Sequence, residues 1–442
     1  MAGKRVPTTA REAALQVLVD CYQRGAWSDS ALSVAIRRAK LAGRDAALAS
    51  RLCYGAQQNQ YLLDFWLEKL CTVPLKKLEP PVRAALELGI YQIAFLERIP
   101  ARAAVHESVE LARRWSRNPN SPRLVNAVLR SYMRQKDSLP QPESLSVRYS
   151  HPQWLVNLFS GELDGVGVEE LLQADNSQPS TVIQVNTLKT DTAGLQARLE
   201  SEGVTVAPHP TLPGCLTISG TGDLEQLDSF REGWFQVQDA AARMAVLVAD
   251  PQPGMQVLDA CAAPGGKSFG AAMAMGNRGR IFSCDLQTKK LGRMIAGANR
   301  LGISCISAKS MDGRVFFPDW ERYFDVVMTD VPCSGLGIIR KKPDIRYKDP
   351  TLLEALPAVQ SDILGNTSRY VKPGGVLLYS TCTVLRRENQ AVVEAFLQNH
   401  PEFQLEHFSL PGIGTCPGMI TLWPHIHGTD GFFIAKLRRE HD

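Results

Sequence analysis

The sequence predicts an all-helical region over residues 1–140, a small α/β connector over residues 141–234, and a doubly wound, mostly parallel α/β sheet over residues 235–442. Three observations predict this division. Helical apolar stripes occupy the first region, and a short strand–helix–strand alternation occupies the second. In the third, apolar runs of buried-strand type recur, each followed closely by an acidic residue or a cysteine. Because open α/β sheets gather functional groups at the carboxyl ends of their strands, we expect a site there.

The helical region carries local start signals. Thr9 and Glu12 have the Thr-x-x-Glu spacing of a capping box, whose side chains satisfy free N–H groups at a helix start. Pro122 marks a second helix start, because proline suits the first helical turn. The apolar stripes that follow both signals are those of core-facing helices, and we assign them to the core.

In the connector, the spacing of apolar residues changes between that of strands and that of a helix. Residues 182–186 alternate as a strand, residues 191–202 are helical, and residues 215–218 are strand-like. The sequence therefore predicts a compact α/β segment between the two larger regions.

The composition is that of an ordinary globular protein. Of 442 residues, 44% are hydrophobic and 21% charged, and no run of 18 apolar residues occurs, so no membrane span is predicted. The ten cysteines include no Cys-x-x-Cys pair, which argues against a zinc site. Unpaired thiols are typical of a reducing compartment, so we expect a cytoplasmic protein. We also expect a monomer that binds neither metal nor membrane.

Positive charge is concentrated in one segment of the helical region. Between Arg98 and Lys136 there are nine Lys or Arg and two Glu, a net charge of +7, whereas the whole chain carries only +4. A concentrated basic surface indicates a polyanionic partner. The alternative interpretation is an ordinary solvated helical face.

A glycine-rich turn follows the first predicted strand of the sheet, residues 255–260. Residues 261–268 read Cys-Ala-Ala-Pro-Gly-Gly-Lys-Ser and enter a helix. Two glycines allow a sharp bend and a close approach to a ligand, and the helix start offers free N–H groups. A phosphate-binding Walker loop is excluded, because its first glycine would have to stand where Cys261 is. The dinucleotide fingerprint Gly-x-Gly-x-x-Gly is also absent.

Carboxylates follow successive predicted strands. Asp285 ends the strand 280–284 and lies 26 residues beyond Asp259, close to the spacing of about 20 at which an acid binds ribose hydroxyls. Asp312 follows a short candidate strand, residues 304–307, and Asp330 follows the next. A single acid of this kind is more often a helix cap. The ordered series favours a nucleoside ligand with positive charge over a polyphosphate.

Two cysteines complete the pattern. Cys333 follows the predicted strand 324–328, and Cys382 follows the predicted strand 376–379. A lone cysteine is usually a small buried hydrophobe. Two thiols delivered to the same edge of a sheet, beside a predicted nucleoside site, indicate nucleophilic chemistry instead.

These residues resemble the RNA (cytosine-5) methyltransferases that use S-adenosylmethionine. The resemblance covers roughly residues 235–442 and lies in Asp-Ala-Cys-Ala-Ala-Pro-Gly-Gly-Lys at 259–267, Asp-x-Pro-Cys-Ser-Gly at 330–335, Arg-Lys-Lys-Pro-Asp-Ile at 340–345, Thr-Cys at 381–382 and Thr-Asp-Gly-Phe-Phe at 429–433. It implies a Rossmann-like methyltransferase fold. The cofactor-binding residues it implies are Cys261, Ala262, Ala263, Pro264, Gly265, Gly266, Lys267, Asp285, Asp312 and Asp330.

The resemblance also implies catalytic roles. Cytosine C5 is a poor nucleophile until a thiolate adds at C6, and the C5 proton must leave before the thiol is expelled. By resemblance, Cys382 is the nucleophile, Asp330 faces the cytosine edge, and Cys333 assists breakdown of the adduct. Since a free thiol has a pKa near about 8.5, Cys382 needs positive surroundings, for which Lys267 and the sulfonium of the cofactor are candidates. The reverse assignment, with Cys333 as the nucleophile, remains an alternative.

The helical region is similar to the NusB type of RNA-binding domain. The similarity lies in Leu-Gly-Ile-Tyr-Gln at 88–92, Ala-Ala-Val-His-Glu-Ser-Val at 103–109 and Leu-Val-Asn-Ala-Val-Leu-Arg at 124–130. Such a domain ahead of a cytosine-5 methyltransferase resembles the bacterial 16S rRNA (cytosine-5) methyltransferases. The resemblance implies 16S rRNA or a small-subunit assembly particle as partner. A tRNA methyltransferase, or an RNA-binding assembly factor with vestigial methylation, is the alternative.

Overall fold

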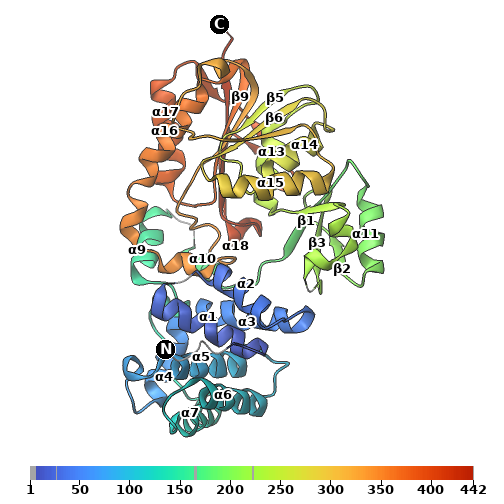
Figure 1. Cartoon of the computed structure of the whole chain (residues 1–442). Coiled ribbons are helices and arrows are strands. Elements are labelled where there is room, and N and C mark those ends of the chain that lie inside the picture. Colours follow the sequence, from blue (N-terminus) through green and yellow to red (C-terminus); the bar gives the residue numbers. More distant parts are fainter. Residues whose placement is uncertain (1–5, 26, 164–166, 222, 442) are drawn as a thin grey trace. The chain divides into compact units, whose positions relative to one another are not determined.

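The computed structural model describes residues 6–25, 27–163, 167–221 and 223–441 (Figure 1). The chain forms two compact units. The helical unit comprises Met1–Ser177 and Ile339–Lys348, and the sheet unit comprises Gln178–Ile338 and Asp349–Asp442. This division follows spatial proximity rather than chain order, so the three ranges expected from the sequence stay predictions.

The described residues of the helical unit form helices around a central one. The larger helices are α1 (Ala10–Arg24), α2 (Ser28–Arg38), α3 (Gly43–Gln58), α4 (Gln60–Leu70), α5 (Pro80–Phe95), α6 (Ala101–Trp115), α7 (Ser121–Gln135), α9 (Gln153–Glu162) and α10 (Val168–Asp175). The short ones are η1 (Leu75–Lys77) and α8 (Leu145–Arg148). Helix α5 is buried along most of its length because α1, α3, α4, α6 and α7 all pack against it.

Local signals place the ends of these helices as predicted. Thr9 Oγ1 accepts a hydrogen bond from Glu12 N at 3.2 Å, which confirms the predicted cap of α1. The Glu12 carboxylate accepts from the Thr8 amide at 2.7 Å. Pro122 lies in the first turn of α7, as predicted.

One segment of the C-terminal half belongs to the helical unit. It contains the 3₁₀ helix η4 (Pro343–Tyr347). The fully buried Arg346 guanidinium donates to Gln58 O at 3.1 Å and to Ser150 O at 3.0 Å. Asp344 accepts from Ser28 N at 2.8 Å. These bonds hold the segment against other residues of the helical unit.

The connector in the sheet unit is a four-stranded antiparallel sheet in the order β2-β3-β1-β4. Its elements are β1 (Thr181–Val185), α11 (Thr192–Ser201), β2 (Thr205–Pro208), β3 (Cys215–Ser219), η2 (Leu224–Gln226), α12 (Asp228–Arg231) and β4 (Phe235–Val237). The predicted strands and helix are confirmed, and Asp191 caps α11 by accepting from Gly194 N at 2.7 Å. Gln236 of β4 donates to Gln184 Oε1 at 2.7 Å and to Gly266 O at 3.3 Å. The connector thereby touches the start of the glycine-loop helix.

The main sheet runs β10-β14-β9-β8-β5-β6-β7, with β13 paired to β14. Its parallel strands are β5 (Gln256–Asp259), β6 (Arg280–Asp285), β7 (Ile306–Ser310), β8 (Phe324–Asp330) and β9 (Val371–Thr381). The antiparallel edge consists of β14 (Phe432–Arg439), β10 (Phe403–Leu405) and β13 (Met419–Leu422). The remaining short elements are η3 (Pro318–Trp320), η5 (Pro350–Leu353), η6 (Arg386–Glu388), β11 (Phe408–Leu410), β12 (Gly414–Cys416) and α18 (Pro424–His427).

Helices cover both faces of this sheet, which confirms the predicted doubly wound architecture. One face carries α13 (Ala240–Ala249), α14 (Gly266–Ala274) and α15 (Thr288–Leu301), and the other carries α16 (Leu356–Ser368) and α17 (Gln390–Asn399) (Figure 1). Successive residues of the same strand enter different cores, as Val257 and Leu258 do. The strand β7 begins two residues later than the predicted strand, and β9 begins five residues earlier.

Candidate active site

The topology brings the two predicted thiols into contact. Strands β8 and β9 are parallel neighbours, with Asp330 opposite Ser380 at their carboxyl ends. Cys333 lies three residues beyond Asp330, and Cys382 lies two residues beyond Ser380. Their Sγ atoms are 3.2 Å apart, within hydrogen-bonding distance, and both side chains are partly accessible.

A cation and a carboxylate lie beside the thiols. Lys267, in the first turn of α14, donates to Asp330 Oδ2 at 2.6 Å, and Ser380 Oγ donates to Asp330 Oδ1 at 2.9 Å. The Lys267 ammonium also lies 5.1 Å from the centre of the Phe432 ring. Burial lowers the pKa of Lys267, but the Asp330 carboxylate outweighs burial and raises it, so the ammonium keeps its charge.

The electrostatics of the two thiols differ. The hydrogen bond from Cys333 lowers the pKa of Cys382, and the Lys267 charge lowers it further, against the effect of burial. The same hydrogen bond raises the pKa of Cys333, and burial adds to the rise. These directions favour Cys382 over Cys333 as the thiol that loses its proton. This asymmetry favours Cys382 as the nucleophile.

The glycine loop has the geometry of a close cradle. Gly265 has φ 111°, and a Cβ built there would lie 2.6 Å from Phe269 Cζ, so a side chain at this position would be strained. Ala263 N donates to Asp285 Oδ2 at 3.2 Å, which ties the loop to the end of β6. Asp285 accepts a second backbone bond, from Gln287 N at 2.8 Å. A backbone cradle beside a strand-end carboxylate fits the nucleoside part of S-adenosylmethionine.

The other predicted acids and the cysteine of the cofactor site differ in burial and in bonding partners. Asp312 accepts from Arg314 Nη2 at 2.7 Å and from Arg314 N at 3.0 Å, bonds that lower its pKa. Cys261 is partly buried, and desolvation raises the pKa of its thiol. Asp259 is fully buried beneath the loop and accepts from Ser268 Oγ at 2.7 Å, and burial raises its pKa to about 6. Asp259 therefore fixes the start of α14 through its bond with Ser268.

The structure adds residues to which the sequence motifs assign no role. Phe432 belongs to the Thr-Asp-Gly-Phe-Phe motif, and its ring packs over Lys267. Gly337 and Gly431 approach so closely that a Cβ on Gly337 would lie 1.9 Å from Gly431 O. In the sequence, only the glycines of these two segments could have indicated this close contact.

Among the described residues, no group of three His, Cys, Asp or Glu side chains could hold a metal ion. No described helix is long and apolar enough to cross a membrane.

A parallel sheet with a glycine cradle, strand-end acids and helices on both faces defines a Rossmann-like methyltransferase domain, and its methyl donor is S-adenosylmethionine. Family models match residues 246–438 (16S rRNA methyltransferase RsmB/F), 8–134 (NusB family) and 151–225 (RsmF/B-like ferredoxin-like domain). The chain belongs to the RsmB/F family of 16S rRNA methyltransferases.

Relatives are similar over the whole chain. Proteins named as probable ribosomal RNA small subunit methyltransferase B, from Synechocystis and from Bacillus subtilis, are each 35% identical over 98% of this chain and 99% of their own length. The ribosomal RNA small subunit methyltransferase B of Salmonella arizonae is 34% identical over 90% of this chain and 91% of its own. The crystal structure of PH0851 superposes with a TM-score of 0.79 at 28% identity, covering 98% of this chain and 99% of that one.

Proposed function

We propose that this chain transfers a methyl group from S-adenosylmethionine to C5 of a cytosine in 16S rRNA, through a bond between Cys382 Sγ and C6. The observation that carries the proposal is the pair of sulfurs 3.2 Å apart, one favouring the thiolate and the other keeping the proton, beside the Lys267–Asp330 pair. The names of the relatives support the rRNA substrate.

Each residue has a defined part in this reaction. The cofactor supplies an electrophilic methyl group. Cys382 thiolate adds at C6, and the electron pair of the C5=C6 double bond makes C5 nucleophilic. The Asp330 carboxylate and the Lys267 ammonium offer an acceptor and a donor to the polar edge of the ring. After C5 has gained the methyl group, a water molecule takes the C5 proton, the electron pair of that C–H bond re-forms the C5=C6 double bond, and the C6–S bond breaks to release Cys382 as a thiolate. The Cys333 thiol donates a hydrogen bond to that leaving sulfur.

Covalent trapping tests the two thiols. We expect Cys382→Ala to form no protein–RNA adduct on a denaturing gel, because the attacking sulfur is gone. We expect Cys333→Ala to accumulate the adduct, because release of the sulfur loses its hydrogen-bond donor. The reverse pattern would assign the attack to Cys333.

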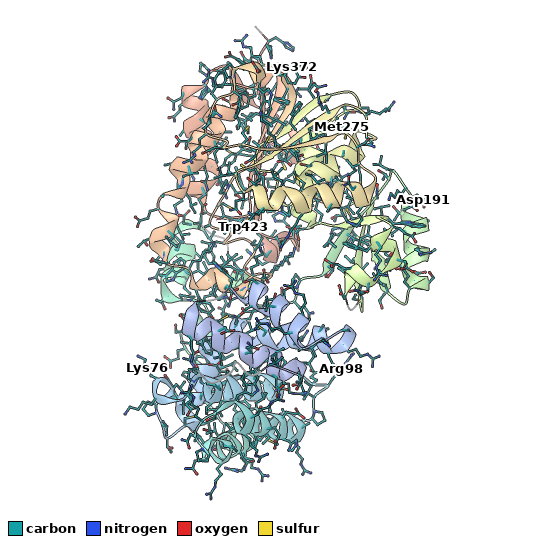
Figure 2. All side chains as sticks on the ribbon, viewed as in Figure 1. Lys76, Arg98, Asp191, Met275, Lys372 and Trp423 are labelled. Atoms are coloured by element: carbon teal, nitrogen blue, oxygen red, sulfur yellow. The ribbon has the colours of Figure 1, made fainter. Side chains whose placement is uncertain are left out.

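The basic segment supports an RNA substrate. All nine of its Lys and Arg side chains are exposed, on or beside α6 and α7, and Arg98 points outward from the helical unit (Figure 2). Two of them make ion pairs, Arg113 with Glu110 and Arg114 with Glu12. Binding to phosphates is the usual role of such a surface.

Methyl transfer to three substrates separates the alternatives. Naked 16S rRNA, assembled small subunits and bulk tRNA should be compared, because the target base must be single-stranded or flipped out of its stack. Methylation of tRNA alone would favour the tRNA enzyme. Binding to the ribosomal RNA without transfer would favour the assembly factor. Cytoplasmic location and the monomeric state stay part of the proposal.

A further inference from the structure

The peptide on both sides of Cys333 is anchored to one buried pair of side chains. Gln360 Nε2 donates to Pro332 O at 3.0 Å, and Ser334 N donates to Glu388 Oε2 at 2.9 Å. The pair is itself closed by a bond from Gln360 Nε2 to the same Glu388 oxygen at 2.8 Å. The residues before and after Cys333 are therefore fixed, while the thiol between them stays partly accessible.

The peptide around Cys382 is anchored in the same way by a single amide. Thr381 Oγ1 donates to Asn389 Oδ1 at 2.6 Å. Asn389 Nδ2 donates to Thr383 O at 3.0 Å. The Asn389 side chain thus spans Cys382 and binds the residue on each side of it.

The two anchors are consecutive residues of the chain. Glu388 and Asn389 follow each other at the end of η6, and both are fully buried. Tyr379 OH donates to Glu388 O at 2.6 Å, which fixes the dipeptide to β9. Ser334 Oγ donates to Thr383 Oγ1 at 2.8 Å and joins the two cysteine loops directly.

The burial of Glu388 argues against a role in packing alone. Among the described residues, its Oε1 has no hydrogen-bond partner. A buried polar side chain with an unpartnered oxygen is costly, and an apolar side chain would fill the space at lower cost. The carboxylate lies close enough to Cys333 to raise the pKa of that thiol, whereas Lys267 lowers that of Cys382.

We propose that Glu388 and Asn389 are positioning residues of the reaction, Glu388 for the Cys333 loop and Asn389 for the Cys382 loop, and that together they set the distance between the two sulfurs. This inference rests on the proposed function. The dipeptide acts through the cysteines and needs no direct interaction with the RNA. The two members act on different steps, because Cys382 makes the bond to C6 and Cys333 assists its breakage.

The first test measures the adduct with a 16S rRNA transcript. We expect Asn389→Ala to form adduct more slowly than the wild type, and Glu388→Ala to accumulate adduct as Cys333→Ala does. Glu388→Gln keeps an acceptor for Ser334 N and should behave closer to the wild type than Glu388→Ala. Gln390→Ala is the matched control, because its side chain bonds Thr421 instead of either cysteine loop. Equal loss of adduct formation and adduct release in both alanine variants would overturn the proposal.

The second test needs no RNA and so separates this proposal from the proposed function. Iodoacetamide alkylation of Cys382, followed by mass spectrometry of the full chain at pH 7, reports the thiolate fraction. Loosening either loop weakens the hydrogen bond from Cys333, and a rise of one unit in the pKa of Cys382 slows alkylation about tenfold. We expect slowing in Asn389→Ala and Glu388→Ala, and none in Gln390→Ala. Unchanged alkylation would overturn the positioning role even if the adduct chemistry proves correct.

Folding failure has its own control. Gln360→Met retains the size of the side chain but loses its bonds to Pro332 O and Glu388, so it should reproduce the Glu388→Ala result with Glu388 itself unchanged. Melting temperature and S-adenosylmethionine affinity, measured for every variant, show whether the sheet unit is intact. A Gln360→Met variant that binds cofactor normally and alkylates at the wild-type rate would refute the inference.

Discussion

Replacing Lys267 with methionine removes one charge from the centre of the candidate site. The ammonium is 12% exposed and donates to Asp330 Oδ2 at 2.6 Å. A hydrogen bond to a charged group contributes about 1.5–3 kcal/mol, so we expect Lys267→Met to lower the free energy of unfolding by about 2 kcal/mol. The larger consequence is for Cys382, which loses the Lys267 charge while Asp330 continues to raise its pKa.

The sign of the pH effect follows from the nucleophile. In the proposed reaction, methyl transfer requires the Cys382 thiolate, whose population rises with pH. A higher pKa of Cys382 moves the rising limb of the rate–pH profile to higher pH. If that pKa rises by one, the rate falls about tenfold at any pH below the limb. We therefore expect the loss of rate in Lys267→Met to be largest below the rising limb and to shrink as the pH approaches about 10.

The assay is single-turnover methyl transfer from about pH 6 to about pH 10, with cofactor affinity measured in parallel. Lys267→Arg should keep the wild-type limb, because it retains the positive charge. Lys372→Met is the matched control, since Lys372 pairs with Asp325 at 2.7 Å at the far end of β9 and is more exposed (Figure 2). An exposed pair contributes less than about 1 kcal/mol. A Lys267→Met rate that falls by the same factor at every pH would refute the reasoning.

Three further outcomes follow from the same structure. Gly265→Ala should weaken S-adenosylmethionine binding about tenfold by calorimetry, because a Cβ at φ 111° would lie 2.6 Å from Phe269 Cζ, and about 1.4 kcal/mol of the resulting strain would oppose binding. Arg346→Met should destabilise the full chain by about 3 kcal/mol in thermal unfolding, because buried carbonyl acceptors lose their donor. Replacing Arg117 and Arg123 with alanine should reduce the slope of log Kd against log salt by about 1 for each phosphate that is no longer bound, with the chemical rate unchanged.

The sequence predicted the residues at strand ends well, because that inference needs only local information. An apolar run followed by Asp330 or Cys333 shows where a parallel strand ends, and neighbouring parallel strands end at one edge of the sheet. The sequence pattern did not show which strands are direct neighbours in the sheet. That β8 and β9 pair directly, and so bring Cys333 to 3.2 Å from Cys382, depends on strand order.

Side chains that are buried by residues far away in the sequence could not be recognised from local patterns. Residues 340–342 read Arg-Lys-Lys, which is typical of an exposed basic loop, yet the neighbouring Arg346 is fully buried against residues of the helical unit. Glu388 follows two arginines and has the local pattern of a surface acid, but it is fully buried. Both side chains are buried because of distant backbone atoms that hydrophobic periodicity does not report.

Strand order also explains how the two thiols acquire different chemistry. The middle of the sheet runs β9-β8-β5, so the loops after these three strands are adjacent. The loop after β5 leads into α14 and supplies Lys267, the end of β8 supplies Asp330 with Cys333 beyond it, and the end of β9 supplies Cys382. The Lys267 ammonium binds Asp330, whereas Glu388 binds the Cys333 loop through the Ser334 amide. The pKa of Cys382 is lowered and that of Cys333 is raised because the two thiols follow neighbouring strands and have different flanking groups.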